Sequence, residues 1–195
     1  AALGRVRRPE GRRTVAGLAA RPPVAAPGGR RLSCPAMPAL DAGVVEVYVF
    51  RRRARRVEFL ALRRRPDDTL AGVWQPVTGT LRRGEGTVRG ALREVREETG
   101  ARVLRLWRLE AVSAYFDPPR DAIRFITRFA AEIPASEVVR RSREHTAHRF
   151  VSAREAATRF LWASQREGLA AVRGQILRGG ARARALEIAV PIAGS

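Results

Sequence analysis

Residues 79–101 read GTLRRGEGTVRGALREVREETGA, and this stretch decides the fold of the chain. The apolar stripe of an amphipathic helix runs along it, formed by Val88, Ala91, Leu92 and Val95. We expect the helix to begin after Thr87 as its N-cap and to end at Gly100, where a left-handed residue stops it.

The polar face of this helix is acidic. At about 100° per residue, Glu94, Glu97 and Glu98 lie together on the side opposite the apolar stripe. Three carboxylates this close repel one another, and Arg93, one turn before Glu97, is the residue best placed to offset them. A hard cation such as Mg²⁺ relieves the repulsion, because it prefers oxygen ligands. The alternative for these glutamates taken alone is a solvated acidic face.

Residues upstream of the helix argue against that alternative. The complete spacing is G-x5-E-x7-R-E-U-x-E-E-x-G-U, carried by Gly79, Glu85, Arg93, Glu94, Glu97, Glu98 and Gly100. It resembles the signature of the Nudix hydrolases, with every fixed position filled. The resemblance implies an α+β fold, the Nudix-type α/β/α sandwich with a mixed central sheet. It also implies an enzyme that uses Mg²⁺, or Mn²⁺ in its place, to cleave a diphosphate linkage.

The resemblance assigns roles to individual residues. The implied metal ligands are the Gly79 carbonyl, Glu94, Glu97, Glu98 and Glu144. The implied catalytic residues are Glu97 as general base, Glu94, Arg93 to orient the glutamates, and Glu144 to activate water. Glu85 is expected to brace the loop or to bind a second ion. Glu144 lies outside the signature, and a surface carboxylate in an arginine-rich segment is its equal alternative.

Weaker marks concern the substrate. Residues 74–79, WQPVTG, resemble the approach to the signature in bacterial dihydroneopterin triphosphate pyrophosphatases, and Glu144-His145 and Trp162 resemble later marks of that group. Pro76 and Gln165 depart from its pattern. The expected substrate-binding residues are Arg64, Thr78, Trp74 and Ser164. A solvated strand end is the alternative for Arg64, and a place in the core is the alternative for Trp74.

Composition adds little to the functional assignment. The formal net charge is +19, yet all 38 basic residues are arginine, spread along the chain. That bias fits a GC-rich coding sequence better than a nucleic-acid surface, so we expect no nucleic-acid partner, while the positive field attracts polyphosphates. A single cysteine excludes an internal disulfide, and the two histidines lack zinc-ligand spacing. No apolar run reaches membrane-spanning length, so we expect no membrane partner and a cytoplasmic location.

The organisation expected from sequence has three parts. Residues 1–36 are rich in Arg, Ala, Pro and Gly and favour a disordered extension. Met37 is a candidate start, and a transit peptide is the rival interpretation of the segment before it. Residues 37–180 form the hydrolase domain and residues 181–195 a tail, with the apolar Leu186–Ile192 able to dock.

Strand patterns cover 44–50, 57–62, 103–108, 111–116 and 123–132. A turn is expected at 51–56 and a loop at 117–121, with terminal helices at 153–160 and 165–178. Ser152 and Glu155 form a capping-box pattern before the first of these helices.

Three functional hypotheses remain open. The first is a pyrophosphohydrolase of nucleoside or pterin triphosphates, with dihydroneopterin triphosphate as the favoured substrate. The second is a hydrolase of dinucleoside polyphosphates, sugar nucleotides or oxidised nucleotides. The third is a nucleotide-sensing module without catalysis, which the intact signature disfavours. Each has a small-molecule polyphosphate ligand, and both a monomer and a homodimer are compatible with the sequence.

Overall fold

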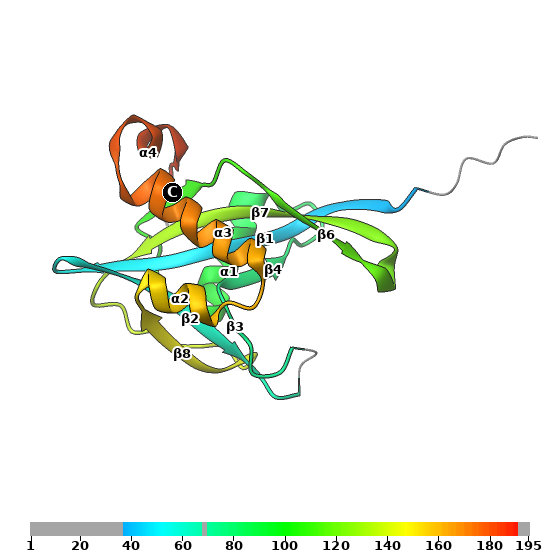
Figure 1. Cartoon of the computed structure of the whole chain (residues 1–195), viewed down its shortest axis with the longest axis horizontal. Coiled ribbons are helices and arrows are strands. Elements are labelled where there is room, and N and C mark those ends of the chain that lie inside the picture. The colour runs from blue at the N-terminus through cyan, green and yellow to red at the C-terminus, as the bar shows by residue number, and fades with distance from the viewer. Residues whose placement is uncertain (1–36, 68–69, 191–195) are drawn as a thin grey trace, which may run out of the picture. The chain divides into compact units, whose positions relative to one another are not determined.

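The apolar run that begins at residue 44 lies in the middle of the sheet (Figure 1). The structure, a computed structural model, describes residues 37–67 and 70–190. β1 (Ala39–Arg53) and β2 (Arg56–Arg64) form a hairpin, in which Arg53 pairs with Arg56 around a turn that includes Ala54. The turn is therefore present but shorter than the predicted 51–56: it spans residues 54–55, and the rest of the arginine run belongs to the two strands.

The other strands complete a mixed sheet. They are β3 (Trp74–Gln75), β4 (Val77–Thr80), β5 (Arg105–Arg108), β6 (Ser113–Asp117), β7 (Ala122–Ile133), β8 (His145–Val151) and β9 (Glu187–Ile188). The order along the main path is β3-β2-β1-β7-β5-β9, while β4 pairs with β1, β6 with β7 and β8 with β2. β1 and β7 run parallel and the other pairs are antiparallel.

Helices cover both faces of this sheet (Figure 1). They are α1 (Thr87–Thr99), α2 (Ala153–Arg159), α3 (Ala163–Ala171), the π-helical η2 (Val172–Leu177) and α4 (Gly180–Leu186). On one face, Ala91 and Val95 of α1 pack against Val45 and Val47. On the other, Tyr48 and Phe50 pack against α2 and α3. Side chains of β1 alternate between the two layers, which gives the expected three-layer α/β/α sandwich with a mixed sheet.

The ends of α1 differ in one respect from expectation. Gly100 adopts the left-handed conformation with φ of 68°, as predicted, and its N–H donates to the Arg96 carbonyl. The N-cap is Gly86 rather than Thr87, so Thr87 becomes the first helical residue. Glycine supplies no side-chain cap, and the loop before the helix is instead held by Glu85.

Elsewhere the sequence pattern missed short elements. β3, β4 and β8 were not predicted, because the first two are brief and separated by Pro76, and β8 is mostly polar over its first five residues and lacks a regular alternation. The predicted helix 165–178 is α3 followed by η2, and α4 was not predicted. The loop at 117–121 holds one 3₁₀ turn, η1 (Pro118–Arg120), and the Ser152 hydroxyl accepts from Glu155 N–H as expected.

Part of the predicted organisation falls where the structure gives no description. The expected extension at 1–36 and the end of the tail at 191–195 lie outside the described residues. Within the described residues, Glu187–Ile188 pair with Leu106–Trp107, so this part of the tail joins the sheet. None of the described helices has the length and apolar character needed to span a membrane.

Candidate functional site

One guanidinium organises the acidic face of α1. Arg93 donates from Nε and Nη2 to both oxygens of Glu85, at 2.8 and 2.7 Å. Its Nη1 donates to Glu94 at 2.7 Å and to Glu97 at 2.9 Å. Nη2 also donates to the Thr80 carbonyl at 3.1 Å. The repulsion expected among the clustered carboxylates is therefore offset by one bidentate cation.

Glu85 ties the loop to this network. Besides Arg93, its carboxylate accepts from the Arg82 backbone N–H at 2.9 Å. These two hydrogen bonds, that to Arg93 first, lower the pKa of Glu85 to about 2. Glu85 therefore stays ionised at neutral pH and holds the turn before α1 in place.

We expect Arg93 to matter for stability, because Glu85 and Glu94 lose their shared partner without it. Arg93→Gln should lower the free energy of unfolding by about 1–2 kcal/mol, a modest value since solvent reaches part of the network. Chemical denaturation measures the change. Arg89→Gln, on the exposed side of the same helix, is the matched control. Equal midpoints for the two variants would show that the network contributes nothing.

Glu98 is the most deeply buried carboxylate of the group. Its residue is 3% exposed. Burial, then the charges of Glu94 and Glu144, raises the pKa of Glu98 to about 9, opposed by a hydrogen bond from Thr78 N–H. Its Oε2 atom has no hydrogen-bond partner, and His145 Nε2 is 3.7 Å away. A buried carboxylate oxygen that lacks a donor is the type of atom that a cation would satisfy.

Glu94 and Gly79 are in close contact. Burial is the main cause that raises the pKa of Glu94, with Arg93 opposing it. The Glu94 carboxyl group packs so closely on Gly79 that a β-carbon at residue 79 would overlap it. Gly79 therefore serves close approach, as glycine does where a chain must come near another group. β4 pairs with β1 along one edge, and from its other edge Thr78 N–H and the Thr80 carbonyl reach Glu98 and Arg93.

The carboxylates of this site suit a hard cation, although they are not arranged around a single point. Among them, no three Asp, Glu, His or Cys side chains are arranged to hold a metal ion as they stand, and Arg93 holds Glu94 and Glu97 by hydrogen bonds. Two observations favour a cation nonetheless. Glu98 carries an oxygen without a donor, and the charges of Glu94 and Glu144 both raise its pKa. Oxygen donors of this kind suit Mg²⁺ or Mn²⁺.

Two of the predicted substrate residues adjoin the carboxylates. Arg64 donates to the Gln75 side chain at 3.4 Å, and its charge lowers the pKa of Glu98. The Thr78 hydroxyl lies 3.1 Å from Gln75 Nε2. Gln75 links these two residues and was missed by sequence reasoning. A polar residue within WQPVT, beside a proline, was the available signal.

The structure does not join the other two predicted residues to the carboxylates. Trp74 packs against the cluster under α2 and α3, with Arg159 and Arg149 guanidinium carbons 5.2 and 5.9 Å from its ring centroid. Trp74 is therefore partly packed in the core, which was the alternative to a substrate contact. Ser164 lies in the first turn of α3, half-buried, on the face of the sheet opposite α1. No contact described for Ser164 reaches the glutamates.

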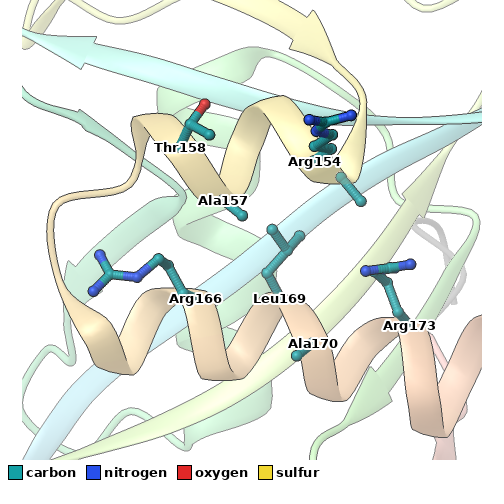
Figure 2. A pocket seen from close by; sticks show the side chains of 8 residues that line it. Arg154, Ala157, Thr158, Arg166, Leu169, Ala170 and Arg173 are labelled. Atoms are coloured by element: carbon teal, nitrogen blue, oxygen red, sulfur yellow. The ribbon is translucent and has the colours of Figure 1, made fainter.

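A separate cavity of about 480 Å³ lies between α2 and α3, as Figure 2 shows. Its floor includes Ala157 and Leu169, and Arg154, Arg166 and Arg173 surround it. Arg166 is held by the Phe160 and Leu161 carbonyls. The residues that line this cavity include none of the predicted site residues, although Trp74 and Ser164 lie on the same face of the sheet.

Comparison with known proteins places these observations in a family. The model of the NUDIX domain matches residues 39–172. Similar solved structures include an Ap4A hydrolase from C. elegans in a binary complex, 20% identical, covering 67% of this chain and 93% of that one with a TM-score of 0.58. The dihydroneopterin triphosphate pyrophosphohydrolase of E. coli is 20% identical and covers 66% and 94%, with a TM-score of 0.53. At these identities the likeness concerns the fold alone.

Two further proteins of different printed function are also similar to this chain. The NUDIX domain of Shewanella oneidensis NrtR, complexed with ADP ribose, is 13% identical and covers 74% of this chain and 92% of that one, with a TM-score of 0.57. A protein of Myxococcus xanthus named octanoyltransferase is 32% identical over 126 residues, which are 63% of this chain and 34% of that protein. The chain thus spans about a third of the length of this curated relative.

Proposed function

The chain belongs to the Nudix hydrolase family, and from that premise we propose that it is a metal-dependent pyrophosphohydrolase of nucleoside or pterin triphosphates, with dihydroneopterin triphosphate as substrate. The observation that carries the proposal is the buried Glu98, whose Oε2 lacks a hydrogen-bond donor beside Glu94 and Glu144. A carboxylate cluster of this kind, at the free edge of β4, suits a cation that binds a diphosphate.

In this proposal Glu94 and Glu98 are the main ligands of Mg²⁺, or of Mn²⁺ in its place, and Glu97 and Glu144 supply further oxygens. The Gly79 carbonyl, expected from the sequence as a ligand, is instead on the edge of β4 that pairs with β1. When bound, the metal neutralises the diphosphate and lowers the pKa of water. Arg93 sets the orientation of Glu94 and Glu97 through its short hydrogen bonds. Glu85 keeps Arg93 in place from the loop side.

Proton transfer falls to the same cluster. Glu97 is the proposed general base, since its side chain is 45% exposed and can meet a water molecule from solvent. Glu144, also exposed, is the second candidate. Arg64 is proposed to hold a phosphate, and Thr78 to donate a hydrogen bond at the mouth of the site. Trp74 and Ser164 remain proposed substrate contacts, on the side of the sheet that α3 covers.

Metal affinity should depend on pH. The raised pKa of about 9 means that Glu98 is protonated at neutral pH without metal, and a ligand must lose that proton. Binding therefore releases a proton, and the affinity for Mg²⁺ should rise up to about tenfold per pH unit until pH approaches 9. Calorimetry in buffers of different ionisation enthalpy measures both quantities. Affinity independent of pH between 6 and 9 would exclude Glu98 as a ligand.

The substrate choice rests on the marks around the signature. The WQPVTG segment supports a pterin triphosphate, and a pyrophosphohydrolase of that substrate has a similar fold. The Ap4A hydrolase and the ADP ribose complex keep dinucleoside polyphosphates and related nucleotides as the alternative. A sensing module without catalysis is the third hypothesis.

A panel assay separates these hypotheses. Phosphate and pyrophosphate release is measured with Mg²⁺ over dihydroneopterin triphosphate, dATP, Ap4A and ADP ribose. The proposal expects pyrophosphate from dihydroneopterin triphosphate at a kcat/KM well above that for dATP. Preference for Ap4A or ADP ribose would establish the second hypothesis, and tight binding without turnover would establish the third.

A further inference from the structure

Arg128 is a buried cation whose hydrogen-bonding groups are only partly paired. It lies on the face of the sheet that α3 covers. Arg128 of β7 and Glu46 of β1 are Cα partners in the parallel pairing, and they are 5% and 2% exposed. Arg128 Nε is 3.6 Å from Glu46 Oε1, which is too long for a hydrogen bond. Arg128 Nε and Nη2 are buried without any hydrogen-bond partner. Native interiors seldom leave such donors unmet, so a partner that completes them is expected.

Glu46 is hydrogen-bonded from the α3 side, by the Tyr48 hydroxyl and by the Gln165 side chain, and a ligand would take the place of these two partners. Its Oε1 accepts from the Tyr48 hydroxyl at 2.5 Å, and that hydroxyl also lies 2.9 Å from the Gln165 carbonyl in the first turn of α3. Gly168 lets α3 approach this close, because a β-carbon there would overlap the Tyr48 ring and hydroxyl. The first turn of α3 is thus the cover over the Glu46–Arg128 pair.

Thr78 connects the Glu46–Arg128 pair to the proposed metal site. Glu46 is the Cα partner of Arg128 on one side and of Thr78 on the other, so the three side chains form one row on the same face. Thr78 is half-buried at the free edge of β4, where its N–H donates to Glu98. Neighbouring strands are about 4.8 Å apart, which places Arg128 roughly 10 Å across the sheet from Thr78.

We infer that Glu46 and Arg128 recognise the polar edge of the substrate's ring, and that the ring is a 2-amino-4-oxopyrimidine of the type found in guanine and pterin. The inference rests on the proposed function, since the phosphates lie at Glu94 and Glu98. The carboxylate accepts from the ring N–H and the amino group, and the guanidinium donates to the carbonyl oxygen. The ring enters from the Thr78 edge, and the first turn of α3 moves away from Tyr48 to admit it.

This chemistry discriminates between purines. Adenine offers one donor and one acceptor on the corresponding edge, so its ring nitrogen would face the Glu46 carboxylate without a proton. Glu46→Gln replaces one acceptor by an amide donor, which can meet the adenine ring nitrogen while Arg128 still faces the adenine amino group, so the preference for guanine should shrink. Because the side chains have the same shape, the substitution changes hydrogen bonding rather than packing.

Calorimetric affinities for dGMP and dAMP test the inference without any turnover. We expect the unmodified protein to bind dGMP at least about tenfold more tightly than dAMP. Glu46→Gln should bring the two affinities within threefold, and Arg128→Gln should weaken dGMP more than dAMP. Arg154→Gln, which removes an exposed charge from the α2–α3 cavity, is the control and should keep the original ratio.

Thermal unfolding establishes that each variant is folded. Equal affinities in the unmodified protein, or an unchanged ratio in folded Glu46→Gln, would overturn the inference, and Glu46→Gln decides the matter if Arg128→Gln does not fold. A dGMP preference that Glu46→Gln abolishes, in a protein that hydrolyses no triphosphate, would instead refute the proposed function and leave the ring site standing.

Discussion

Glu98→Gln should greatly slow hydrolysis and stabilise the metal-free protein at the same time. The carboxylate proposed to bind the cation cannot be replaced by an amide, so kcat/KM should fall by about 10³-fold. Without metal, however, Glu98 is a buried acid whose pKa is raised to about 9. An amide of the same shape resembles the neutral acid, so the fold should tolerate it.

The direction of the stability effect follows from the pKa. A carboxyl group with a folded pKa above its ordinary value of 4.5 favours the fold at low pH, and that contribution is lost as pH rises toward 9. In EDTA, the free energy of unfolding should therefore decrease with pH, by at most about 1.4 kcal/mol per unit for this group. Glu98→Gln should reduce that slope. A variant that is less stable than the unmodified protein at pH 8 would contradict this assignment.

Gly79→Ala should have the second largest effect on activity. The added β-carbon would overlap the Glu94 carboxyl group, which must then leave its position. The displaced atoms are the end of a side chain, so stability should change little. Misplacement of a reacting group by about 1 Å can cost about 10²-fold in rate, and we expect a loss in kcat/KM of that order.

Gly86→Ala is the matched control for this variant. Gly86 has φ of −76° at the start of α1, and an added β-carbon there would meet no atom within 4 Å. Steady-state hydrolysis with Mg²⁺ compares the two substitutions. Equal activities would mean that the contact between Gly79 and Glu94 has no part in the reaction.

The sequence allowed α1 and its acidic face to be predicted because both depend on neighbours within two turns. The apolar stripe and the grouping of Glu94 with Glu97 follow from helical periodicity, and Gly100 ends the helix because glycine readily adopts positive φ. Thr87 was predicted as the N-cap because a threonine hydroxyl often caps a helix, and this prediction was wrong. In the structure Gly86 is the N-cap, and Glu85 fixes the loop before it.

Contacts between distant segments could not be predicted in this way. Glu46 interrupts an apolar strand, which is a visible signal, but its partner Arg128 is set by the parallel register of β1 and β7. The contacts of Gln75 with Arg64 and Thr78 depend on the two-residue strand β3, which the sequence pattern did not predict. Ser164 and Trp74 were predicted from resemblance alone, and the structure places both away from the carboxylates.

The most direct test of the account is Mg²⁺-dependent hydrolysis by the protein and by its Glu97→Gln, Glu98→Gln double variant. We predict that the unmodified protein releases phosphate or pyrophosphate from a nucleoside or pterin triphosphate only with a divalent cation. The double variant should still bind the triphosphate but lose turnover. Absence of release from every triphosphate, or undiminished release by the double variant, would contradict the assignment of these carboxylates to a metal-dependent hydrolase.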